Sequence, residues 1–397
     1  MSEGTSTVDG GRGLRIAMVG TRGVPARYGG FETAVEEIGR RLVARGHAVT
    51  VYCRTTGDDR RRQHLGMRLV HLPAARHKAL ETLSHTALSS LHLLVRGRYD
   101  VALLFNAANA PFIPLIRARR IPVATHVDGL EWRRAKWGGL GRKYYRVAEG
   151  LAVRWSDTLI ADAQGIADYY RAEFGVPSDL ISYGAPILID VPADRLKPLG
   201  LETGSYHLVV ARFEPENHVD VAVAGYLRSR ARHPLVVVGA APYSDQYTQR
   251  IRDLAERDPR IRLLGAIWDQ DQLDQLYAHA LTYVHGHSVG GTNPSLLRAM
   301  GAGTAVLAFD VGFNREVIGF DEDAFWPDEG ALAGLLDAAE SDPVECAAFG
   351  KRLRVRAETT YNWDDVTLAY ERMCRRLFEW RGAQRPGTPS LLRIARR

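Results

Sequence analysis

The most informative segment of the chain is His285-Gly-His-Ser-Val-Gly-Gly-Thr-Asn-Pro-Ser-Leu-Leu-Arg-Ala-Met300. The residues before it, Leu281-Thr-Tyr-Val284, are typical of a short buried strand. The residues after it, Thr304-Ala-Val-Leu-Ala308, are typical of the next strand. Because the stretch itself ends in a helical pattern, we expect a strand, a glycine turn, a helix and a second strand in succession.

The middle of this stretch is suited to bind an anion. Gly290 and Gly291 let the backbone approach a bound group closely. Thr292 or Asn293 can cap a helix whose first residue is Pro294. The free N–H groups and the positive dipole of a helix start attract phosphates. An ordinary strand-to-helix turn would use the same residues, so the rest of the chain is needed to distinguish an anion site from such a turn.

The composition indicates a soluble globular protein of two or three domains. The chain has 397 residues, of which 46% are hydrophobic and 25% charged. Its formal charge of +6 suits anionic ligands, an anionic membrane surface or nucleic acid. Cys53, Cys346 and Cys374 lack metal-ligand spacing and are typical of reduced thiols in a cytoplasmic protein.

Neither a secretory signal nor a membrane span is expected. Residues 1–13 are polar and rich in Gly, Ser and Thr, so we expect a disordered tail there. The most apolar run of the first half, residues 87–95, is far shorter than the roughly 20 residues that span a bilayer. Any membrane contact would therefore be peripheral.

Short strand patterns alternate with helical ones along most of the chain. The alternation runs from Leu14 to about residue 185, lapses in a Pro- and Gly-containing linker, and restarts at His207. Alternation of this kind predicts parallel strands with crossover helices. We therefore expect two doubly wound α/β domains of similar size facing a central cleft, with sites in the loops that follow strands.

The first such loop is Gly20-Thr-Arg-Gly-Val-Pro-Ala-Arg-Tyr-Gly-Gly-Phe-Glu32. Gly29 and Gly30 precede a helix and suit close approach to a phosphate or sugar. The spacing is not that of the dinucleotide fingerprint, so NAD binding is disfavoured. The alternative is a glycine-rich turn whose arginines are simply solvated.

A second loop, residues 126–137, concentrates polar and aromatic groups. His126, Asp128 and Glu131 at a strand end are candidates for a general base or for binding hydroxyl groups. The alternative is a structural histidine, with Trp132 as an ordinary core residue.

Two further loops carry charge. Arg212-Phe-Glu-Pro-Glu-Asn217 places an arginine where its fork of donors can clamp a diphosphate. The alternative is a surface ion pair of Arg212 with Glu214 or Glu216. Asp269-Gln-Asp271 has the spacing of a metal and sugar-nucleotide motif, but we interpret it as a structural helix start, and no metal site is predicted.

Taken together and in order, these motifs resemble those of the retaining GT-B glycosyltransferases that use nucleotide-diphosphate sugars. The chain is most similar to the bacterial polysaccharide branch that includes rhamnosyltransferases. The resemblance covers roughly Leu14 to Phe378. It is carried by Gly20–Thr33, His126–Trp132, Arg212–Asn217 and Gly290–Leu297.

The resemblance implies a division of labour between the domains. The C-terminal domain, residues 200–362, would hold the nucleotide sugar without a metal or other cofactor. The N-terminal domain, residues 14–192 plus 363–397, would hold the acceptor. Residues 363–397 are counted with this domain because the C-terminal helix would cross back onto it. The implied catalytic residues are Arg212, His126 and Asp128. The implied donor-binding residues are Gly29, Gly30, Gly265, Ile267, Gly290, Gly291, Thr292, Asn293, Arg298 and Glu316. The implied acceptor-binding residues are Tyr28, Glu131 and Trp132.

The chain departs from the family pattern at two positions. Arg298 stands where the family carries a glutamate that usually holds the ribose, and Asn217 stands where a lysine commonly lies beside the diphosphate. The missing lysine leaves more of the diphosphate clamping to Arg212, and Arg298 removes the usual carboxylate partner of the ribose hydroxyls. Glu316 is a candidate for the same pocket.

The expected activity is sugar transfer from a nucleotide-diphosphate donor to a hydroxyl of a glycan, lipid-linked or small-molecule acceptor. A natural-product glycosyltransferase, a nucleotide-sugar epimerase and a non-catalytic nucleotide-sugar-binding protein remain alternatives. Nucleic-acid binding is disfavoured, because aromatic and basic residues do not alternate on a repeated surface. The segment Trp132–Arg146 is either a contact with an anionic membrane, at the inner face, or a solvated amphipathic helix.

Overall fold

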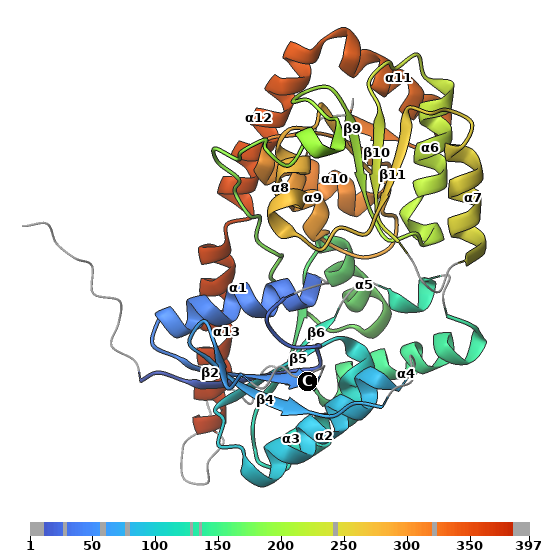
Figure 1. The fold of residues 1–397 in the computed structure, drawn as a ribbon. Helices are drawn as coiled ribbons and strands as arrows, with labels where there is room; N and C mark the ends of the chain where they lie inside the picture. The colour runs from blue at the N-terminus through green and yellow to red at the C-terminus, as the bar shows by residue number, and fades with distance from the viewer. Residues whose placement is uncertain are drawn as a thin grey trace, which may run out of the picture. The chain divides into compact units, whose positions relative to one another are not determined.

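The computed structural model describes residues 12–26, 30–55, 61–75, 80–127, 130–134, 137–240, 245–319 and 324–383 (Figure 1). The contacts within it divide the chain into two compact units. The first comprises Met1–His126, Leu151–Leu159 and Thr367–Arg397, and the second comprises Val127–Gly150 and Ile160–Val366. Tyr28, Gly29 and Asp128, three of the predicted site residues, lie outside the described residues.

The first sheet has eight strands in the order β3-β4-β2-β1-β5-β6-β7-β8. The pairs β4–β2, β2–β1, β1–β5, β5–β6 and β7–β8 are parallel, and the edge strand β3 pairs antiparallel to β4. Central strands are buried on both faces because helices cover both faces of a parallel sheet. The strands are β1 (Arg15–Val19), β2 (Ala48–Arg54), β3 (Gln63–His64), β4 (Met67–Leu72), β5 (Val101–Phe105), β6 (Val123–Val127), β7 (Thr158–Ala161) and β8 (Asp179–Leu180).

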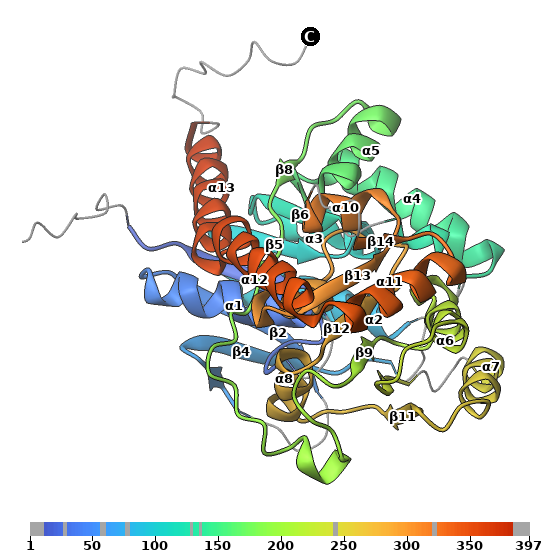
Figure 2. The same cartoon turned by 90° about the horizontal axis from the view of Figure 1, so that it is seen from above.

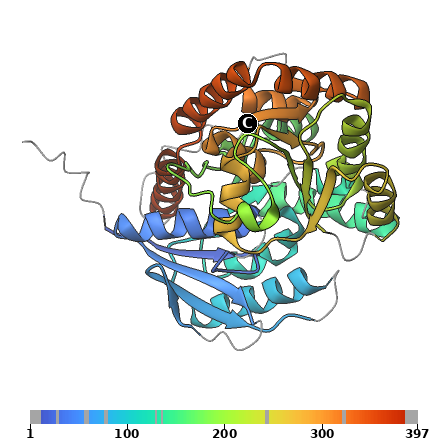
Figure 3. The same cartoon turned by 45° about the horizontal axis from the view of Figure 1, so that its top comes forward.

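Helices of the first unit lie on both faces of this sheet. Helix α1 (Gly30–Ala44) lies on one face, and helices α2 (Glu81–Arg96) and α3 (Ile113–Arg117) lie together on the other (Figure 3). A 3-10 helix, η1 (Ala107–Phe112), leads into α3. Helix α1 buries Ala34, Val35, Ile38 and Leu42, which recur at helical spacing.

The C-terminal helix α13 (Trp363–Ala383) is anchored to the first unit by a buried carboxylate. Glu371 accepts hydrogen bonds from Arg45 and from Arg375 Nη2 at 2.8 Å, and it lies 3.1 Å from His47 Nε2. Burial opposes ionisation of Glu371, yet these donors lower its pKa to about 2. The expected return of the last helix to the N-terminal domain is therefore confirmed.

The second sheet has six strands in the order β11-β10-β9-β12-β13-β14, and its strand pairs are parallel. Numbered from its first strand, this order is 3-2-1-4-5-6, the order of a Rossmann-type sheet. The same order runs through strands β4 to β7 of the first sheet. The strands are β9 (His207–Val210), β10 (Leu235–Val238), β11 (Ile261–Gly265), β12 (Thr282–His285), β13 (Ala305–Phe309) and β14 (Phe325–Trp326).

Helices cover this sheet in two groups, which Figure 2 shows from above. Helices α6 and α11 contact each other, as do α9 and α12. The core between α6, α11 and the sheet is built from Val209, Val223, Tyr226, Trp326 and Leu332. The helices of the second unit are α4 (Gly139–Trp155, shared with the first), α5 (Gln164–Phe174), α6 (Val219–Arg228), α7 (Asp245–Ala255), α8 (Gln270–Ala278), α9 (Pro294–Ala302), α10 (Gly312–Ile318), α11 (Glu329–Ser341) and α12 (Pro343–Thr360), with 3-10 turns η2 (Glu131–Arg133), η3 (Lys197–Leu199) and η4 (Pro215–Asn217).

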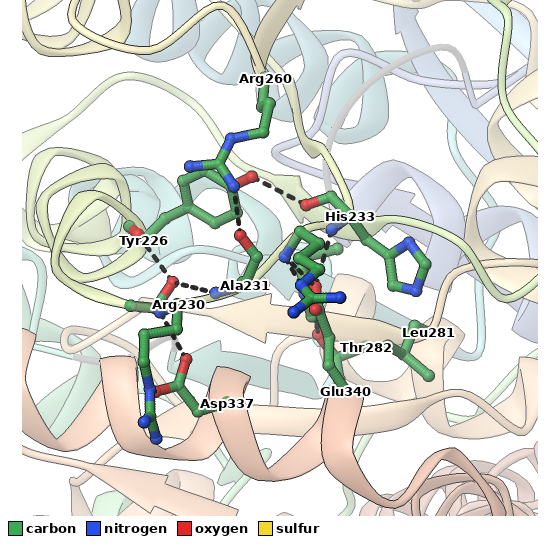
Figure 4. Close-up of polar contacts among 12 residues, drawn as sticks. Tyr226, Arg230, Ala231, His233, Arg260, Leu281, Thr282, Asp337 and Glu340 are labelled. Atoms are coloured by element: carbon green, nitrogen blue, oxygen red, sulfur yellow. Dashed lines mark hydrogen bonds and ion pairs between the residues drawn. The ribbon is translucent and has the colours of Figure 1, made fainter.

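One carboxylate fixes α11 to the amino ends of the strands (Figure 4). Glu340 accepts hydrogen bonds from the backbone N–H groups of Arg232 and His233, each at 2.8 Å, and lies 3.1 Å from His207 Nε2. The other ring nitrogen of His207 lies 2.8 Å from Thr282 Oγ1. Burial disfavours the charged form of Glu340, but these partners lower its pKa to about 2. The cluster is structural, because it lies at the opposite end of the strands from the loops described next.

Candidate functional site

The strand order of the second sheet reverses between β9 and β12, and ligands of such sheets bind where the loops after those two strands meet. The loop after β9 carries Arg212, and the loop after β12 carries Gly290. Ser288 joins the two loops, since its N and Oγ donate to the carbonyl oxygen of Glu216 at 2.9 and 3.0 Å. The structure thus brings two separately predicted loops into contact.

The glycine loop leads into a capped helix, α9, as expected. Asn293, rather than Thr292, is the N-cap residue, and its Oδ1 accepts hydrogen bonds from Ser295 N at 2.9 Å and Ser295 Oγ at 2.7 Å. Pro294 occupies the first helical position. Gly290 has φ +138°, which favours glycine. Pro294 has no N–H group, Ser295 N donates to Asn293 Oδ1, and Leu297 N donates to the carbonyl oxygen of Asn293 at 3.1 Å, so within this first turn only the N–H of Leu296 remains for an anion.

Thr292 does not cap α9 but hydrogen-bonds to the residue that follows β7. Its Oγ1 donates a 2.6 Å hydrogen bond to the backbone oxygen of Asp162, which directly follows strand β7. The Asp162 side chain is buried, and its Oδ1 has no hydrogen-bond partner among the described residues. Burial, with repulsion from Glu316, raises the pKa of Asp162 to about 8, so this carboxyl group is protonated at neutral pH.

Glu316 lies in the same neighbourhood, although the sequence could not place it. Both of its carboxylate oxygens accept from the backbone N–H of Gln164, at 2.8 and 3.0 Å. Glu316 and Gly291 therefore both border Asp162. Asp162 was missed from the sequence, yet a signal existed, because it is a polar residue immediately after a strand.

Arg212 is ion-paired in the structure. Its Nη2 lies 3.3 Å from Glu214 Oε2, so the alternative of an Arg212–Glu214 pair is the arrangement observed, with a buried rather than a surface carboxylate. Glu214 also lies 3.8 Å from Arg134, which pairs with Glu131 at 2.5 Å. Glu131, predicted in the acceptor loop, is thereby linked to Arg212 by a chain of alternating charges.

The two departures from the family pattern have structural partners. Asn217 is buried, and its Nδ2 donates to the backbone oxygen of Arg212 at 2.8 Å, so it orders the loop from within. Arg298 pairs with Asp274 of helix α8. Asp274 also accepts from Gln270 Nε2 at 2.8 Å. The guanidinium of Arg298 is therefore held between helices α8 and α9.

Gly265 and Ile267, two of the implied donor-binding residues, lie at the end of β11 and in the loop that connects it to α8. Gly265 has φ +71°, and its carbonyl oxygen accepts from Gly239 N at 2.9 Å. Ile267 is half-buried beside it. Asp269 caps α8 by accepting from the N–H groups of residues 271 and 272, at 3.1 and 3.2 Å. The structural interpretation of Asp269-Gln-Asp271 is confirmed.

The predicted residues of the first unit lie near aromatic side chains. His126, at the end of β6, is 1% exposed, and its ring centroid lies 5.1 Å from that of Phe31 and 5.8 Å from that of Phe105. Burial lowers the pKa of His126 to about 3, so the ring is neutral at pH 7. Gly30 is the first residue of α1. A catalytic role for His126 stays a prediction.

Trp132, the remaining predicted acceptor residue, lies between cations. The guanidinium carbons of Arg133 and Arg146 each lie 5.1 Å from its ring centroid, within the range of cation–π attraction. Its role in acceptor binding stays a prediction.

Neither a metal-binding cluster nor a membrane-spanning helix occurs among the described residues. Within these residues, His, Cys, Asp and Glu side chains form no group of three or more that could hold a metal ion. None of the helices there is long and apolar enough to cross a membrane. An open hollow of about 630 Å³ is lined by none of the predicted site residues, and by His218, Val221, Arg228, Phe309, Pro327, Asp328, Glu329 and Gly330.

Comparison with known families agrees with this geometry. Residues 29–184 match the model described as a glycosyl transferase 4-like domain, and residues 193–356 match the model for glycosyl transferases group 1. The two matches are consecutive and together cover most of the chain. The chain belongs to the GT-B glycosyltransferases. This glycosyltransferase has two Rossmann-like domains, as the sequence predicted.

Individual relatives are more distant. O-antigen chain mannosyltransferase B of Escherichia coli is 28% identical over 170 residues, which are 39% of this chain and 44% of that protein. The GtfA subunit of a Streptococcus gordonii UDP-N-acetylglucosamine–peptide N-acetylglucosaminyltransferase is 27% identical over 139 residues, 34% of this chain and 25% of that protein. The chain thus spans less than half the length of these two curated relatives.

Solved structures are similar in fold over nearly the whole chain. Sucrose-phosphate synthase from Thermosynechococcus elongatus superposes with a TM-score of 0.80 at 21% identity, covering 92% of this chain and 100% of that chain. Anabaena HepE, solved in complex with UDP-glucose, gives a TM-score of 0.71 at 16% identity, covering 91% of this chain and 100% of that chain.

Proposed function

We propose that this protein transfers a sugar from a nucleotide-diphosphate donor to a hydroxyl group of a glycan or lipid-linked acceptor, with retention at the anomeric carbon and without a metal. The observation that carries the proposal is the contact between the Arg212 loop and the glycine loop at the switch point of the second sheet, through Ser288 and Glu216. A helix start and a guanidinium beside one another suit a pyrophosphate.

In this mechanism the protein supplies electrostatic stabilisation. The N–H of Leu296 and the dipole at the start of α9, together with Arg212, would stabilise the charge that develops on the leaving diphosphate. For Arg212 to do so, its guanidinium would exchange Glu214 for the donor phosphates. A donor phosphate oxygen would take the acceptor proton on the same face of the sugar, so no protein nucleophile is assigned.

We expect the donor sugar to be a deoxyhexose such as rhamnose, or a hexose. The hexose alternative gains support from the mannosyltransferase name of the Escherichia coli relative. We also expect the protein to work in the cytoplasm, peripherally at the inner face of the membrane, because a lipid-linked acceptor would be found there.

The test is turnover of a panel of nucleotide-diphosphate sugars, with and without a hydroxyl acceptor, in the presence of EDTA. We expect nucleotide release that depends on the acceptor, and a product with the anomeric configuration of the donor. Arg212→Ala should lower this rate by about a hundredfold to a thousandfold. The matched control Arg228→Ala, on helix α6 with an exposed side chain, should leave it unchanged. Equal rates for both variants would remove Arg212 from the proposal.

A second candidate is a protein that binds nucleotide sugars without catalysis. It is favoured by Arg298 and Asn217, whose polar groups are engaged by Asp274 and by the Arg212 carbonyl rather than free for a donor. Binding across the panel without transfer or hydrolysis would support this candidate. Epimerised product without an acceptor would instead indicate an epimerase.

A further inference from the structure

Helix α2 is amphipathic in the opposite sense from an ordinary surface helix. Its sheet side carries four polar residues, His85, Thr86, Ser89 and Ser90, together with Leu93, and each of the five is 0% exposed. The outer side carries apolar residues at helical spacing. These are Leu88, Leu91 and Val95, which are 38%, 49% and 67% exposed. A surface helix normally buries its leucines and exposes its serines.

The buried polar side is poorly satisfied by its own unit. Among the described residues, the hydroxyl groups of Thr86 and Ser90 have no hydrogen-bond partner, whereas His85 hydrogen-bonds to the backbone of Cys53. Ser89 is satisfied only by the carbonyl oxygen of His85, at 2.7 Å. Burying such groups disfavours folding, as exposing leucine does. Packing on the sheet therefore does not explain the pattern of α2, whereas an apolar contact on its outer side does.

The neighbouring helix extends the same outer surface. Helices α2 and α3 contact each other and lie on one face of the sheet (Figure 3). On α3, Leu115 is 36% exposed. We call the outer side of the two helices and their C-terminal turns the α2–α3 surface. It comprises Leu88, Leu91, Val95, Arg96, Arg98, Leu115, Arg119 and Arg120, all of which are exposed.

The charge of the α2–α3 surface has one sign. Four arginines, Arg96, Arg98, Arg119 and Arg120, border its apolar residues. Between residues 88 and 120 the only acidic residue is Asp100, which is 3% exposed and paired with Arg15 at 2.9 Å. A partner of this surface must therefore offer both apolar groups and negative charge.

We propose that the α2–α3 surface docks on an anionic lipid bilayer. Leu88, Leu91 and Val95 enter the boundary between headgroups and acyl chains, and the arginines contact the headgroup phosphates. Interfacial helices combine leucine on one side with basic residues at its border in this way. The proposal does not depend on the donor or on the transfer reaction. Given the proposed function, it also brings the first unit to a lipid-linked acceptor.

Other occupants fit less well. A second copy meeting this surface across a two-fold axis would face the same arginines, and like charges repel. Residues 384–397 of this chain carry four arginines and no acidic residue, so the same repulsion applies to them. A nucleic acid offers the charge, but its backbone gives Leu88, Leu91 and Val95 no apolar partner.

The test is sedimentation of the full chain with vesicles of phosphatidylcholine alone or mixed with phosphatidylglycerol. We expect pelleting with the mixed vesicles at low salt and about tenfold less with phosphatidylcholine alone. The variants Leu91→Glu/Val95→Glu and Arg119→Glu/Arg120→Glu should each lose about tenfold in apparent affinity. These side chains are exposed, and unchanged thermal melting and nucleotide binding would verify that each variant folds.

The matched control is Arg142→Glu/Lys143→Glu, on the exposed side of α4 and within the segment Trp132–Arg146. Pelleting of this control like the wild type supports the α2–α3 surface. Loss of pelleting in this control alone would assign membrane contact to α4 and overturn the proposal. So would absence of pelleting by the wild type, or a dimer in light scattering that Leu91→Glu/Val95→Glu dissociates. Because nucleotide binding is a separate measurement, failure here leaves the proposed sugar transfer standing.

Discussion

The Asp162 side chain fills the space that a side chain at position 291 would need. A Cβ at Gly291 would overlap Asp162 Oδ1 and would lie 2.8 Å from its Cγ and 2.7 Å from Ile166 Cδ1. Glycine is therefore required there by close packing rather than by its backbone dihedral angles. The glycine loop keeps its position because it rests on the residue that follows β7.

From this contact we predict that Gly291→Ala displaces the loop. The variant should lose about 1–3 kcal/mol of stability through overpacking, and its affinity for nucleotide diphosphates should fall about tenfold. Gly312→Ala is the matched control, because a Cβ at position 312 meets nothing within 4 Å. Thermal-shift titration with UDP, GDP and dTDP measures both effects. Equal affinities for the two variants would contradict the role of the loop.

The raised pKa of Asp162 predicts a pH-dependent stability. Between its ordinary pKa, near 4, and its folded value of about 8, the folded state holds a proton that the unfolded state releases. The free energy of unfolding should therefore fall as the pH rises through this window, and level off above pH 8. Asp162→Asn removes this contribution. Urea denaturation at pH 5.5 and 8.5 should show a smaller decrease for the variant than for the wild type, and equal decreases would refute the assignment.

The Arg298–Asp274 pair predicts coupling between helices α8 and α9. Each side chain is about one-fifth exposed, so we expect a coupling free energy of about 1 kcal/mol in a double-mutant cycle with alanine. The exchanged pair Arg298→Asp/Asp274→Arg should recover part of the stability lost by Arg298→Asp alone. Chemical denaturation of the variants measures the coupling. Strict additivity would show that the two side chains contribute independently.

The lowered pKa of Glu340 predicts that the folded state loses stability in acid. Its folded pKa of about 2 lies below its ordinary value near 4.5, so its contribution is present above pH 4.5 and is lost as the pH falls toward 2. Glu340→Gln should cost about 2 kcal/mol at pH 7, because the N–H groups of Arg232 and His233 would lose a charged acceptor. The difference from the wild type should shrink as the pH is lowered from 5 to 3. A constant difference would mean that the charge of Glu340 does not matter.

Much of the fold could be predicted from the sequence because the relevant signals are local. Alternating buried strands and helices, a lapse near residues 185–205 and a glycine turn before Pro294 predict two doubly wound domains without knowledge of any long-range contact. The same is true of the caps, since Asn293 and Asp269 act on N–H groups two or three residues away.

Partner choice between distant segments was not predictable in this way. The contacts of Arg298 with Asp274 and of Asp162 with Gly291 depend on which segments come together in the folded chain. The inverted pattern of α2 was not predictable for the same reason. Two of its serines become buried, and two of its leucines exposed, only when the helix packs on its sheet.

Local sequence patterns predict the architecture and the loops where ligands could bind, because strand, turn and helix propensities act over a few residues. The folded arrangement was needed to show which charges are neutralised, which carboxyl group keeps its proton and which helix side stays apolar and uncovered by its own unit. Those properties depend on burial and on through-space distance, and neither is encoded at any single position of the chain.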